Sequence, residues 1–359
     1  MANMFDFVRK NGEQTFSKKP FTEADNLVFS LLTYLDFDGT DAVKPAGARM
    51  YKVAEQYFEI NSLKEVAKFG MAQKDAYELL KEIYDKPRYR DVVVSNFEYD
   101  ASGEFQFGAA CFLLTPHLMY VSFEGTDYLM DSWREDFEFS YSSPTVAEKM
   151  AIDYVNRVIR ATGPDVIVGG HSKGGHWALY AAMYGKRLKT RKIVRIMSND
   201  GPGLRREDLQ SYRYAAVRGR YTHFVPSNSV VGMLLYDDKY EVVRSNAKGL
   251  VAHHISTWEL VCDKIRPAKA LSENSVKLRD GVRRWLELHD NYDRERITNV
   301  IFGIFKKSGI EATMDIKSAK NIIKVVKNIG GLDDSSKEFV LDLISTASSL
   351  NLKRLKPGS

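Results

Sequence analysis

A serine flanked by glycines is the residue of this chain best suited to nucleophilic chemistry. Residues 170–174 read Gly-His-Ser-Lys-Gly, between an apolar run at 166–168 typical of a buried strand and an alanine-rich stretch at 177–183 typical of a helix. A G-x-S-x-G pattern at a strand-to-helix turn is a nucleophile elbow. The tight turn needs glycine two residues to either side, and it holds the serine hydroxyl at a helix N-terminus, where free N–H groups favour negative charge. Ser172 is therefore the candidate nucleophile.

The same stretch has two competing interpretations. An ordinary glycine-rich turn between a strand and a helix produces the same short pattern, because glycine and serine are common residues. A phosphate-binding loop requires Gly-Lys followed by Ser or Thr. Here Lys173 precedes two glycines, and His176 follows them, so the residue order excludes that loop.

A serine nucleophile needs a histidine to take its proton and a carboxylate to orient the histidine. In open α/β sheets, sites form outside the carboxyl ends of the strands. The predicted strand at 192–197 is followed by Asp200, and the loop after the last predicted strand, at 240–244, carries His253 and His254. The order serine, acid, histidine is that of α/β-hydrolases. The sequence therefore predicts a triad of Ser172, Asp200 and one of the two histidines.

An acyl-transfer site also needs donors for the developing oxyanion. The residue after the nucleophile, Lys173, supplies one backbone N–H in an elbow of this kind. Thr126, which follows Gly125 after the predicted strand at 118–123, is placed to contribute the second.

The elements that must position these residues alternate between strands and helices, which predicts an α/β sheet with a parallel middle. Turns at 100–103 and 115–117 make the early strands antiparallel. We expect a mixed, mostly parallel sheet flanked by helices, with a helical N-terminal region at 1–90, an α/β core at 91–260 and a helical C-terminal region at 261–359. A Thr22-x-x-Asp25 pattern predicts a helix start in the first region.

Composition sets the remaining limits. The chain has 359 residues, of which 44% are hydrophobic and 12% aromatic, enough for one large domain or two medium ones. A net charge of +5 is too mild for a dedicated nucleic-acid-binding protein. Cys111 and Cys262 lie far apart, with neither metal-ligand spacing nor a disulfide pattern. No signal peptide and no apolar run of membrane-spanning length is present, so we expect a cytoplasmic protein.

Several stretches together resemble known families. Phe123-Glu-Gly-Thr-Asp127 with Trp133 and the Gly-His-Ser-Lys-Gly-Gly elbow are similar to the corresponding motifs of class 3 lipases. More closely, the chain resembles the bacterial Mbeg-like, lipase-related family of α/β-hydrolase fold. The stretches that carry this resemblance are 24–36, 125–127, 170–175, 200–203, 225–235 and 253–258.

The resemblance implies Ser172 as nucleophile, Thr126 as oxyanion contributor and His253 as base. It favours His253 over His254 because the family pattern places a tryptophan five positions after the histidine, and Trp258 fits. Class 3 lipases carry the acid after the following strand, where this chain has Pro-Ser-Asn at 226–228 and no carboxylate. Asp200 lies one strand earlier, as in pancreatic-type lipases, and Asp237 and Asp238 are the alternatives.

The other candidate side chains are expected to be structural. Asp127 and Asp136 are partners near the oxyanion segment, the tryptophans are core, and the Lys173 side chain is solvated. The remaining histidines considered are surface or core residues rather than metal ligands: His117, His176, His223 and His289. Near the C-terminus, lysines 317, 320, 324 and 327 edge an amphipathic helix. Such a helix typically packs on its domain, and a weak contact with an anionic membrane surface is the alternative.

The sequence thus predicts a lipase-like serine hydrolase that cleaves a lipid or small carboxylic ester through an acyl-enzyme, without a metal or organic cofactor. Two alternatives remain open. One is a non-catalytic α/β-hydrolase-fold interaction protein, and the other is a thioesterase or amidase with the same triad. Acyl chain length, pathway and oligomeric state are not predicted.

Overall fold

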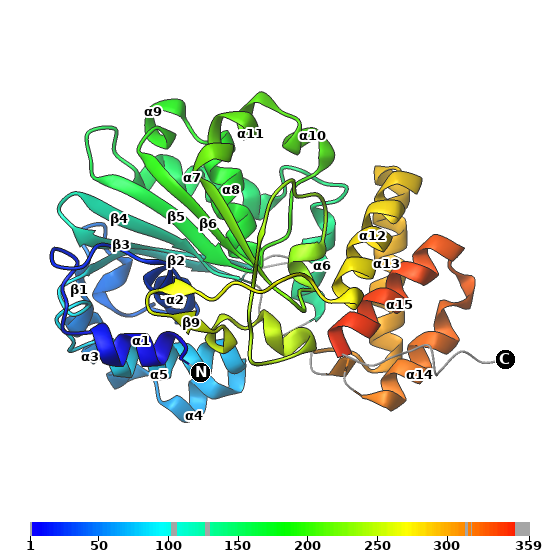
Figure 1. The fold of residues 1–359 in the computed structure, drawn as a ribbon, viewed down its shortest axis with the longest axis horizontal. Coiled ribbons are helices and arrows are strands. Elements are labelled where there is room, and N and C mark those ends of the chain that lie inside the picture. The colour runs from blue at the N-terminus through cyan, green and yellow to red at the C-terminus, as the bar shows by residue number, and fades with distance from the viewer. Residues whose placement is uncertain (1, 102–105, 126–129, 313–314, 317, 349–359) are drawn as a thin grey trace.

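An eight-stranded sheet runs through the middle of the molecule (Figure 1). The computed structural model describes residues 2–101, 106–125, 130–312, 315–316 and 318–348. The strands are β1 (Ala48–Arg49), β2 (Val93–Asp100), β3 (Phe107–Thr115), β4 (Leu118–Phe123), β5 (Asp165–His171), β6 (Ile193–Asn199), β7 (Tyr221–Pro226) and β8 (Glu241–Val243). Each strand pairs with the next along the chain. β1 to β4 pair antiparallel and β4 to β8 pair parallel, so the carboxyl ends of the last five strands share one edge.

Helices cover both faces of this sheet. The first set, at the lower left of Figure 1, is α1 (Met4–Asn11), α2 (Glu23–Leu32), α3 (Met50–Ile60), α4 (Leu63–Val66) and α5 (Met71–Ile83). The second set is α6 (Met130–Glu138), α7 (Val146–Val158), α8 (Lys173–Tyr184), α9 (Arg187–Thr190), α10 (Arg206–Leu209) and α11 (Tyr212–Val217). The C-terminal set, at the right, is α12 (Glu273–Leu288), α13 (Asn291–Ser308), α14 (Ala319–Asn328) and α15 (Asp334–Ser348).

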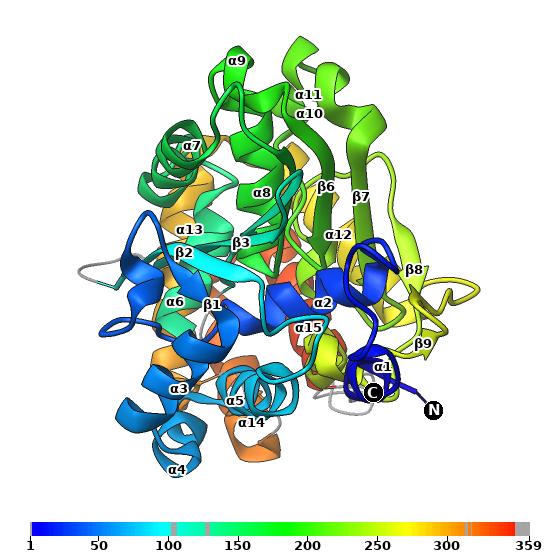
Figure 2. The same cartoon turned by 90° about the vertical axis from the view of Figure 1, so that its left-hand side faces the viewer.

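The sheet separates two hydrophobic cores, because alternate residues of a strand point to opposite faces. Ala110, Phe112 and Leu114 of β3 join the core formed with α1 to α5. Ala109 and Cys111 join the core formed with α7, α8 and the C-terminal helices. Figure 2, turned by 90°, shows α2 on one side of the strands and α7 and α8 on the other.

This architecture is the predicted α/β-hydrolase fold, a mostly parallel sheet flanked by helices and extended by helices at both ends. The predicted capping box is present, since the Thr22 side chain accepts from the Asp25 N–H and the Asp25 carboxylate accepts from the Thr22 N–H. The boundaries at residues 90 and 260 stay predictions. Within the described ranges, no helix combines the length and apolarity needed to cross a membrane.

One element was not predicted. The region at 261–359 was expected to be helical, but β9 (Leu260–Val261) and β10 (Lys264–Ile265) form a small hairpin at its start. Contacts with the N-terminal region hold it, because the Leu260 N–H donates to the Ala2 carbonyl and the Ile265 N–H donates to the Glu23 carboxylate. The hairpin is stabilised by partners more than two hundred residues away in the chain. The local sequence therefore does not predict it.

Candidate active site

Ser172 sits at a sharp turn between β5 and α8, as the elbow pattern predicts. Its backbone has φ 57° and ψ −133°, a conformation that non-glycine residues rarely adopt and that marks strained functional positions. The residue is the N-cap of the twelve-residue helix α8. The helix dipole therefore favours negative charge next to its side chain.

The glycines around Ser172 are required by close packing. A Cβ at Gly170 would lie 2.5 Å from the carbonyl carbon of Gly174, and a Cβ at Gly174 would lie 2.1 Å from the Phe123 carbonyl oxygen. Real Cβ contacts are never this short, so a side chain at either position would push the turn away from β4. The spacing read from the sequence thus has a direct steric cause.

Asp200 and His253 form a buried pair at the carboxyl edge of the sheet. His253 Nδ1 lies 2.7 Å from Asp200 Oδ2. The other carboxylate oxygen of Asp200 accepts from the Ser229 hydroxyl at 2.5 Å and from the Gly232 N–H at 3.2 Å. Asp200 is fully buried, and these three donors compensate the loss of water around its charge. Because Nδ1 of His253 is bonded to Asp200, Nε2 is the ring nitrogen that remains for contact with another group.

The alternative residues are engaged elsewhere. Asp237 is hydrogen bonded to the buried ring of His223, and Asp238 accepts from Tyr214 and Arg218. Of the two adjacent histidines, His253 is the one bonded to Asp200. The geometry therefore brings together the acid and the base that the sequence favours.

His253 contacts His171, the residue that precedes the candidate nucleophile Ser172. His171 Nε2 lies 2.8 Å from the His253 carbonyl oxygen, and the two imidazole centroids are 4.3 Å apart. Among the described residues, no hydrogen bond yet joins the Ser172 hydroxyl to the His253 ring, a contact that often tightens only when substrate binds. Ser172 is 2% exposed and His253 7%, so the site is almost closed to solvent.

Of the two candidate oxyanion donors, Lys173 lies within the described residues and Thr126 does not. Thr126 and Asp127 lie outside the described residues. Gly125, the residue before them, packs directly on the elbow, because a Cβ added there would lie 2.8 Å from the Ser172 Cβ. Lys173 is the first residue of α8, and its N–H belongs to the first turn, whose donors have no partner within the helix.

The expectation that the Lys173 side chain is solvated was wrong. The side chain is completely buried, and its Nζ lies 2.6 Å from Glu135 Oε2 of α6. The ammonium group also lies 5.7 Å from the centroid of the Trp177 ring. A buried lysine needs such a partner because desolvating an isolated ammonium is costly. Lys173 therefore links the elbow helix to α6.

Sequence reasoning missed three residues around the site, which are Tyr34, Glu135 and His171. Tyr34 donates its hydroxyl to His171 at 2.6 Å, and Glu135 pairs with Lys173. Neither His171 nor Tyr34 is among the predicted site residues, although His171 lies inside the elbow motif. Trp133, expected to be core, is buried with its ring centroid 6.3 Å from that of His253. These contacts depend on how α2 and α6 pack on the sheet, which residue spacing does not encode.

The remaining histidines are structural, with one unexpected feature. The His176 ring is buried between Glu148 at 3.0 Å and the Gly203 carbonyl at 2.9 Å. His223 is buried as well, but its Nε2 has no hydrogen-bond partner within the described part of the chain. His176 is therefore a core histidine with both ring nitrogens hydrogen bonded. His223 is a core histidine in which only Nδ1 has a hydrogen-bond partner among the described residues.

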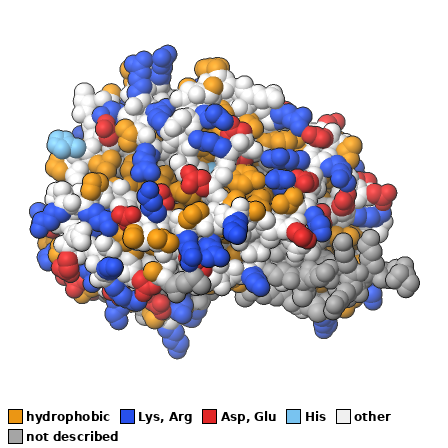
Figure 3. Space-filling model, in the orientation of Figure 1, with side chains coloured by type: hydrophobic (Ala, Val, Ile, Leu, Met, Phe, Trp, Pro, Cys, Tyr) orange, Lys and Arg blue, Asp and Glu red, His pale blue; other side chains and the backbone are white. Residues whose placement is uncertain are grey.

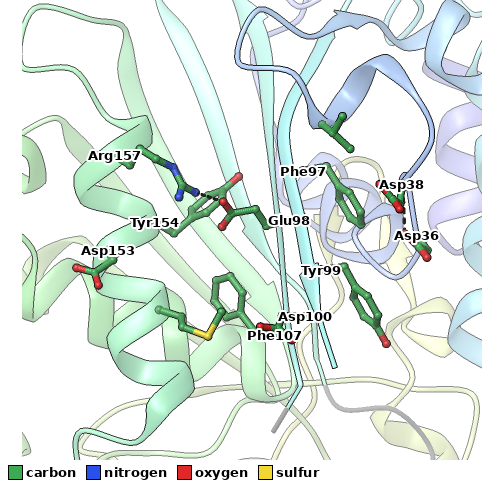
Figure 4. Close-up of a pocket in the computed structure, with 12 residues that line it drawn as sticks. Asp36, Asp38, Phe97, Glu98, Tyr99, Asp100, Phe107, Asp153, Tyr154 and Arg157 are labelled. Atoms are coloured by element: carbon green, nitrogen blue, oxygen red, sulfur yellow. Dashed lines mark hydrogen bonds and ion pairs between the residues drawn. The ribbon is translucent and has the colours of Figure 1, made fainter. Parts of the chain in front are cut away.

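A separate cavity opens at the same edge of the sheet, near the ends of β2 and β3. Its volume is about 660 Å³. Figure 4 shows carboxylates from several elements around it, with Arg157 paired to Glu98 at 2.6 Å. Ser172, Asp200 and His253 do not line it. Phe107, on its wall, packs against Trp177 of α8 with 5.5 Å between ring centroids, so aromatic side chains separate this cavity from the elbow.

Charge is mixed over the described residues on one face of the molecule. On the face drawn in Figure 3, basic and acidic side chains are interspersed with apolar ones. This distribution matches the mild net charge of +5. The face lacks the continuous basic stripe that marks a nucleic-acid-binding surface.

Three comparisons with known proteins were made, and the family model agrees with the predicted family. A search of curated proteins finds no match. Among solved structures, the chain is similar to the crystal structure of M37 lipase, with 16% sequence identity and a TM-score of 0.36. That alignment covers 59% of this chain and 70% of the lipase. The model of the Mbeg1-like family matches residues 83–303, which is more than half of the chain and includes the elbow, Asp200 and His253. The chain belongs to the Mbeg1-like family.

Proposed function

We propose that this protein is a serine hydrolase that cleaves carboxylic esters through an acyl-enzyme. The observation that carries the proposal is the hydrogen-bonded pair of Asp200 and His253 beside a serine with φ 57° at the start of a helix. A strained serine, a histidine and a buried carboxylate in this order form the machinery of α/β-hydrolases. The proposed substrates are lipid or small esters.

In the proposed reaction, the Ser172 hydroxyl attacks the ester carbonyl while His253 Nε2 takes its proton. Asp200 holds Nδ1, which fixes the tautomer and stabilises the imidazolium that forms. The backbone N–H groups of Lys173 and Thr126 receive the oxyanion, each contributing on the order of 3 kcal/mol to transition-state stabilisation. His253 then protonates the leaving alcohol, and water hydrolyses the acyl-enzyme by the same steps. The reaction as proposed needs no metal or organic cofactor.

A fluorophosphonate probe tests the proposal directly, because it reacts with activated serines. We expect one adduct, located on Ser172 by mass spectrometry, that is absent in Ser172→Ala and strongly slowed in His253→Ala. Turnover of p-nitrophenyl esters of graded chain length would then define the acyl group. A folded wild-type protein that forms no adduct and hydrolyses none of these esters would contradict the proposal.

A second candidate function is a non-catalytic interaction protein that keeps the fold. The near-complete burial of Ser172 favours this candidate, since a substrate needs a path to the hydroxyl. The same labelling experiment separates the two functions. A third candidate, thioester or amide hydrolysis, uses the same residues, and only comparison of matched ester, thioester and amide substrates distinguishes it.

A further inference from the structure

His171 occupies an unusual position between the nucleophile and the base. It precedes Ser172 in the chain, its ring is buried, and it contacts the loop of His253 through Nε2. Because the His253 partner is a carbonyl oxygen, which can only accept, the hydrogen of a neutral His171 must sit on Nε2. The lone pair of Nδ1 then faces the Tyr34 hydroxyl 2.6 Å away, which donates to it.

The charge state of His171 matters for the base beside it. Burial, together with the neighbouring His253 ring, holds the pKa of His171 well below its ordinary value. His171 therefore stays neutral while His253 gains a proton during the proposed reaction. A second positive charge on a ring with its centroid 4.3 Å away would oppose that proton transfer.

Tyr34 is held rigidly enough to act on His171. It follows α2, and Asn26 of that helix donates to the Asn199 side chain at 2.7 Å. Asn199 in turn donates to the Gly170 carbonyl at 3.0 Å, so α2 is bonded to the end of β6 and linked through Asn199 to the end of β5. The Tyr34 hydroxyl also lies where any side chain on Gly125 would be, 2.1 Å from its Cβ position.

We propose that Tyr34 and His171 are positioning residues for the catalytic base. Tyr34 donates to the Nδ1 lone pair of His171 and so orients its ring, and His171, through Nε2–H, in turn holds the backbone of His253 so that the His253 ring faces Ser172. The proposal rests on the hydrolase function proposed above. It makes the N-terminal helical region, through Tyr34, a contributor to the active site.

Variants of the two residues test this arrangement as a double-mutant cycle. Tyr34→Phe removes only the hydroxyl, and one lost hydrogen bond corresponds to roughly a 3- to 10-fold lower kcat. KM should change less than twofold, because the proposal gives neither residue a contact with substrate. His171→Leu should lower kcat further, and adding Tyr34→Phe to it should cause no additional loss, since Tyr34 acts through His171.

Tyr89→Phe is the matched control. Tyr89 is another buried tyrosine of the N-terminal region, and its hydroxyl donates to Asp25 at 3.0 Å. We expect this variant to lower the melting temperature as Tyr34→Phe does, while kcat per fluorophosphonate-titrated site is unchanged. Equal kcat in Tyr34→Phe and Tyr89→Phe, or losses from Tyr34 and His171 that add, would overturn the positioning role.

Nitrogen NMR of the imidazole rings provides a readout independent of activity. The His171 signals are identified by their absence in His171→Leu. They should show the Nε2–H tautomer in the wild type, and the Nδ1 resonance should shift in Tyr34→Phe, where Nδ1 has lost its hydrogen-bond donor. An Nδ1–H tautomer in an active wild type would overturn the positioning role alone. A wild type with neither turnover nor adduct would overturn the hydrolase function, and the positioning role with it.

Discussion

Asp200–His253 and Asp237–His223 are two buried aspartate–histidine pairs in different surroundings. Both aspartates bond the Nδ1 atom of their histidine. His253 lies against the elbow, whereas His223 lies within β7 with its second nitrogen buried. A histidine acts as a general base only if its second ring nitrogen can face a substrate. Of the two pairs, Asp200–His253 is therefore the candidate for catalysis.

Asparagine substitution should separate these two pairs. Asp200→Asn no longer selects the correct tautomer of His253, and we expect kcat to fall by about 10³- to 10⁴-fold. Asp237→Asn is the matched control, and its kcat should stay within twofold of the wild-type value. Both variants should be compared at equal folded concentration, measured by circular dichroism. Similar losses of kcat in both variants would show that Asp200 is not the acid of the triad.

The lowered pKa of His171 also predicts a pH dependence of stability. The unfolded chain binds a proton at His171 below about pH 6.5, whereas burial and the His253 ring keep the folded form neutral to much lower pH. The free energy of unfolding should therefore be unaffected above this pH and fall below it, by up to about 1.4 kcal/mol per pH unit.

Urea unfolding at pH 7.5, 6.5 and 5.5 measures this dependence. His171→Leu lacks the group, so its stability should fall less steeply than that of the wild type below pH 6.5. The comparison uses slopes rather than absolute stabilities, because the substitution also removes two hydrogen bonds. Parallel slopes would show that His171 titrates alike in the folded and unfolded states.

At the scale of elements, the ion pair between Lys173 and Glu135 joins α8 to α6. Both side chains are buried, and Glu135 Oε1 has no hydrogen-bond partner among the described residues. Phe137, two residues further along α6, packs on Phe302 of α13, with 5.3 Å between ring centroids. α6 is thus bound on one side to the elbow helix and on the other to the C-terminal helices.

Replacing one partner of this pair should lower the free energy of unfolding more than replacing both partners. Lys173→Met leaves a carboxylate buried without its cation, and we expect a loss of about 3–5 kcal/mol in the free energy of unfolding. Adding Glu135→Leu should recover most of that loss, because two apolar side chains of similar size can replace a buried pair. Denaturant titration of the four proteins measures the coupling energy.

A surface pair is the control for this cycle. Arg284 and Glu338 are 2.8 Å apart and half exposed, so Arg284→Met should cost less than about 1 kcal/mol. If Lys173→Met costs no more than Arg284→Met, the buried pair does not hold α6 against the elbow.

Sheet and elbow were the parts most predictable from the sequence. The run at 166–168, the glycines at 170 and 174, and the aspartate after the next strand are local signals with a steric or topological cause. Tyr34, Glu135 and the hairpin at 260–265 gave no such signal, because each takes its role from a partner brought close only by tertiary packing. The Lys173 side chain was misjudged for the same reason.

At the scale of the whole molecule, the C-terminal helices present a basic surface. Exposed lysines lie at the end of α13 and along α14: Lys306, Lys307, Lys320, Lys324 and Lys327. No ion pair to any of them occurs within the described residues, and Ile323 among them is 43% exposed. Lys317, the fourth lysine of the predicted basic edge, lies outside the described residues. The buried side chains of α14, such as Ile322 and Val325, pack on the neighbouring helices.

We expect this surface to give weak, salt-sensitive binding to anionic vesicles, at about 1 kcal/mol per lysine near the membrane. Lys320→Glu, Lys324→Glu and Lys327→Glu together should reduce co-sedimentation with phosphatidylglycerol vesicles and leave the low binding to phosphatidylcholine unchanged. A triple variant of Lys64, Lys68 and Lys74 changes the net charge equally at another surface. Equal reductions in both triple variants would place the contact elsewhere.

Both ends of the chain hold the loop that carries His253. The Asn3 side chain donates to the Ser256 carbonyl at 3.3 Å, the Ser256 hydroxyl donates to Asp75 at 2.6 Å, and α15 packs against the segment at 249–253. All of these partners, like Tyr34, lie outside residues 83–303, the part that the family model matches. A gene fragment trimmed to the matched part would keep Ser172, Asp200 and His253 and lose contacts that hold the loop of His253. Transferring these three residues to a relative therefore requires moving the flanking helices with them.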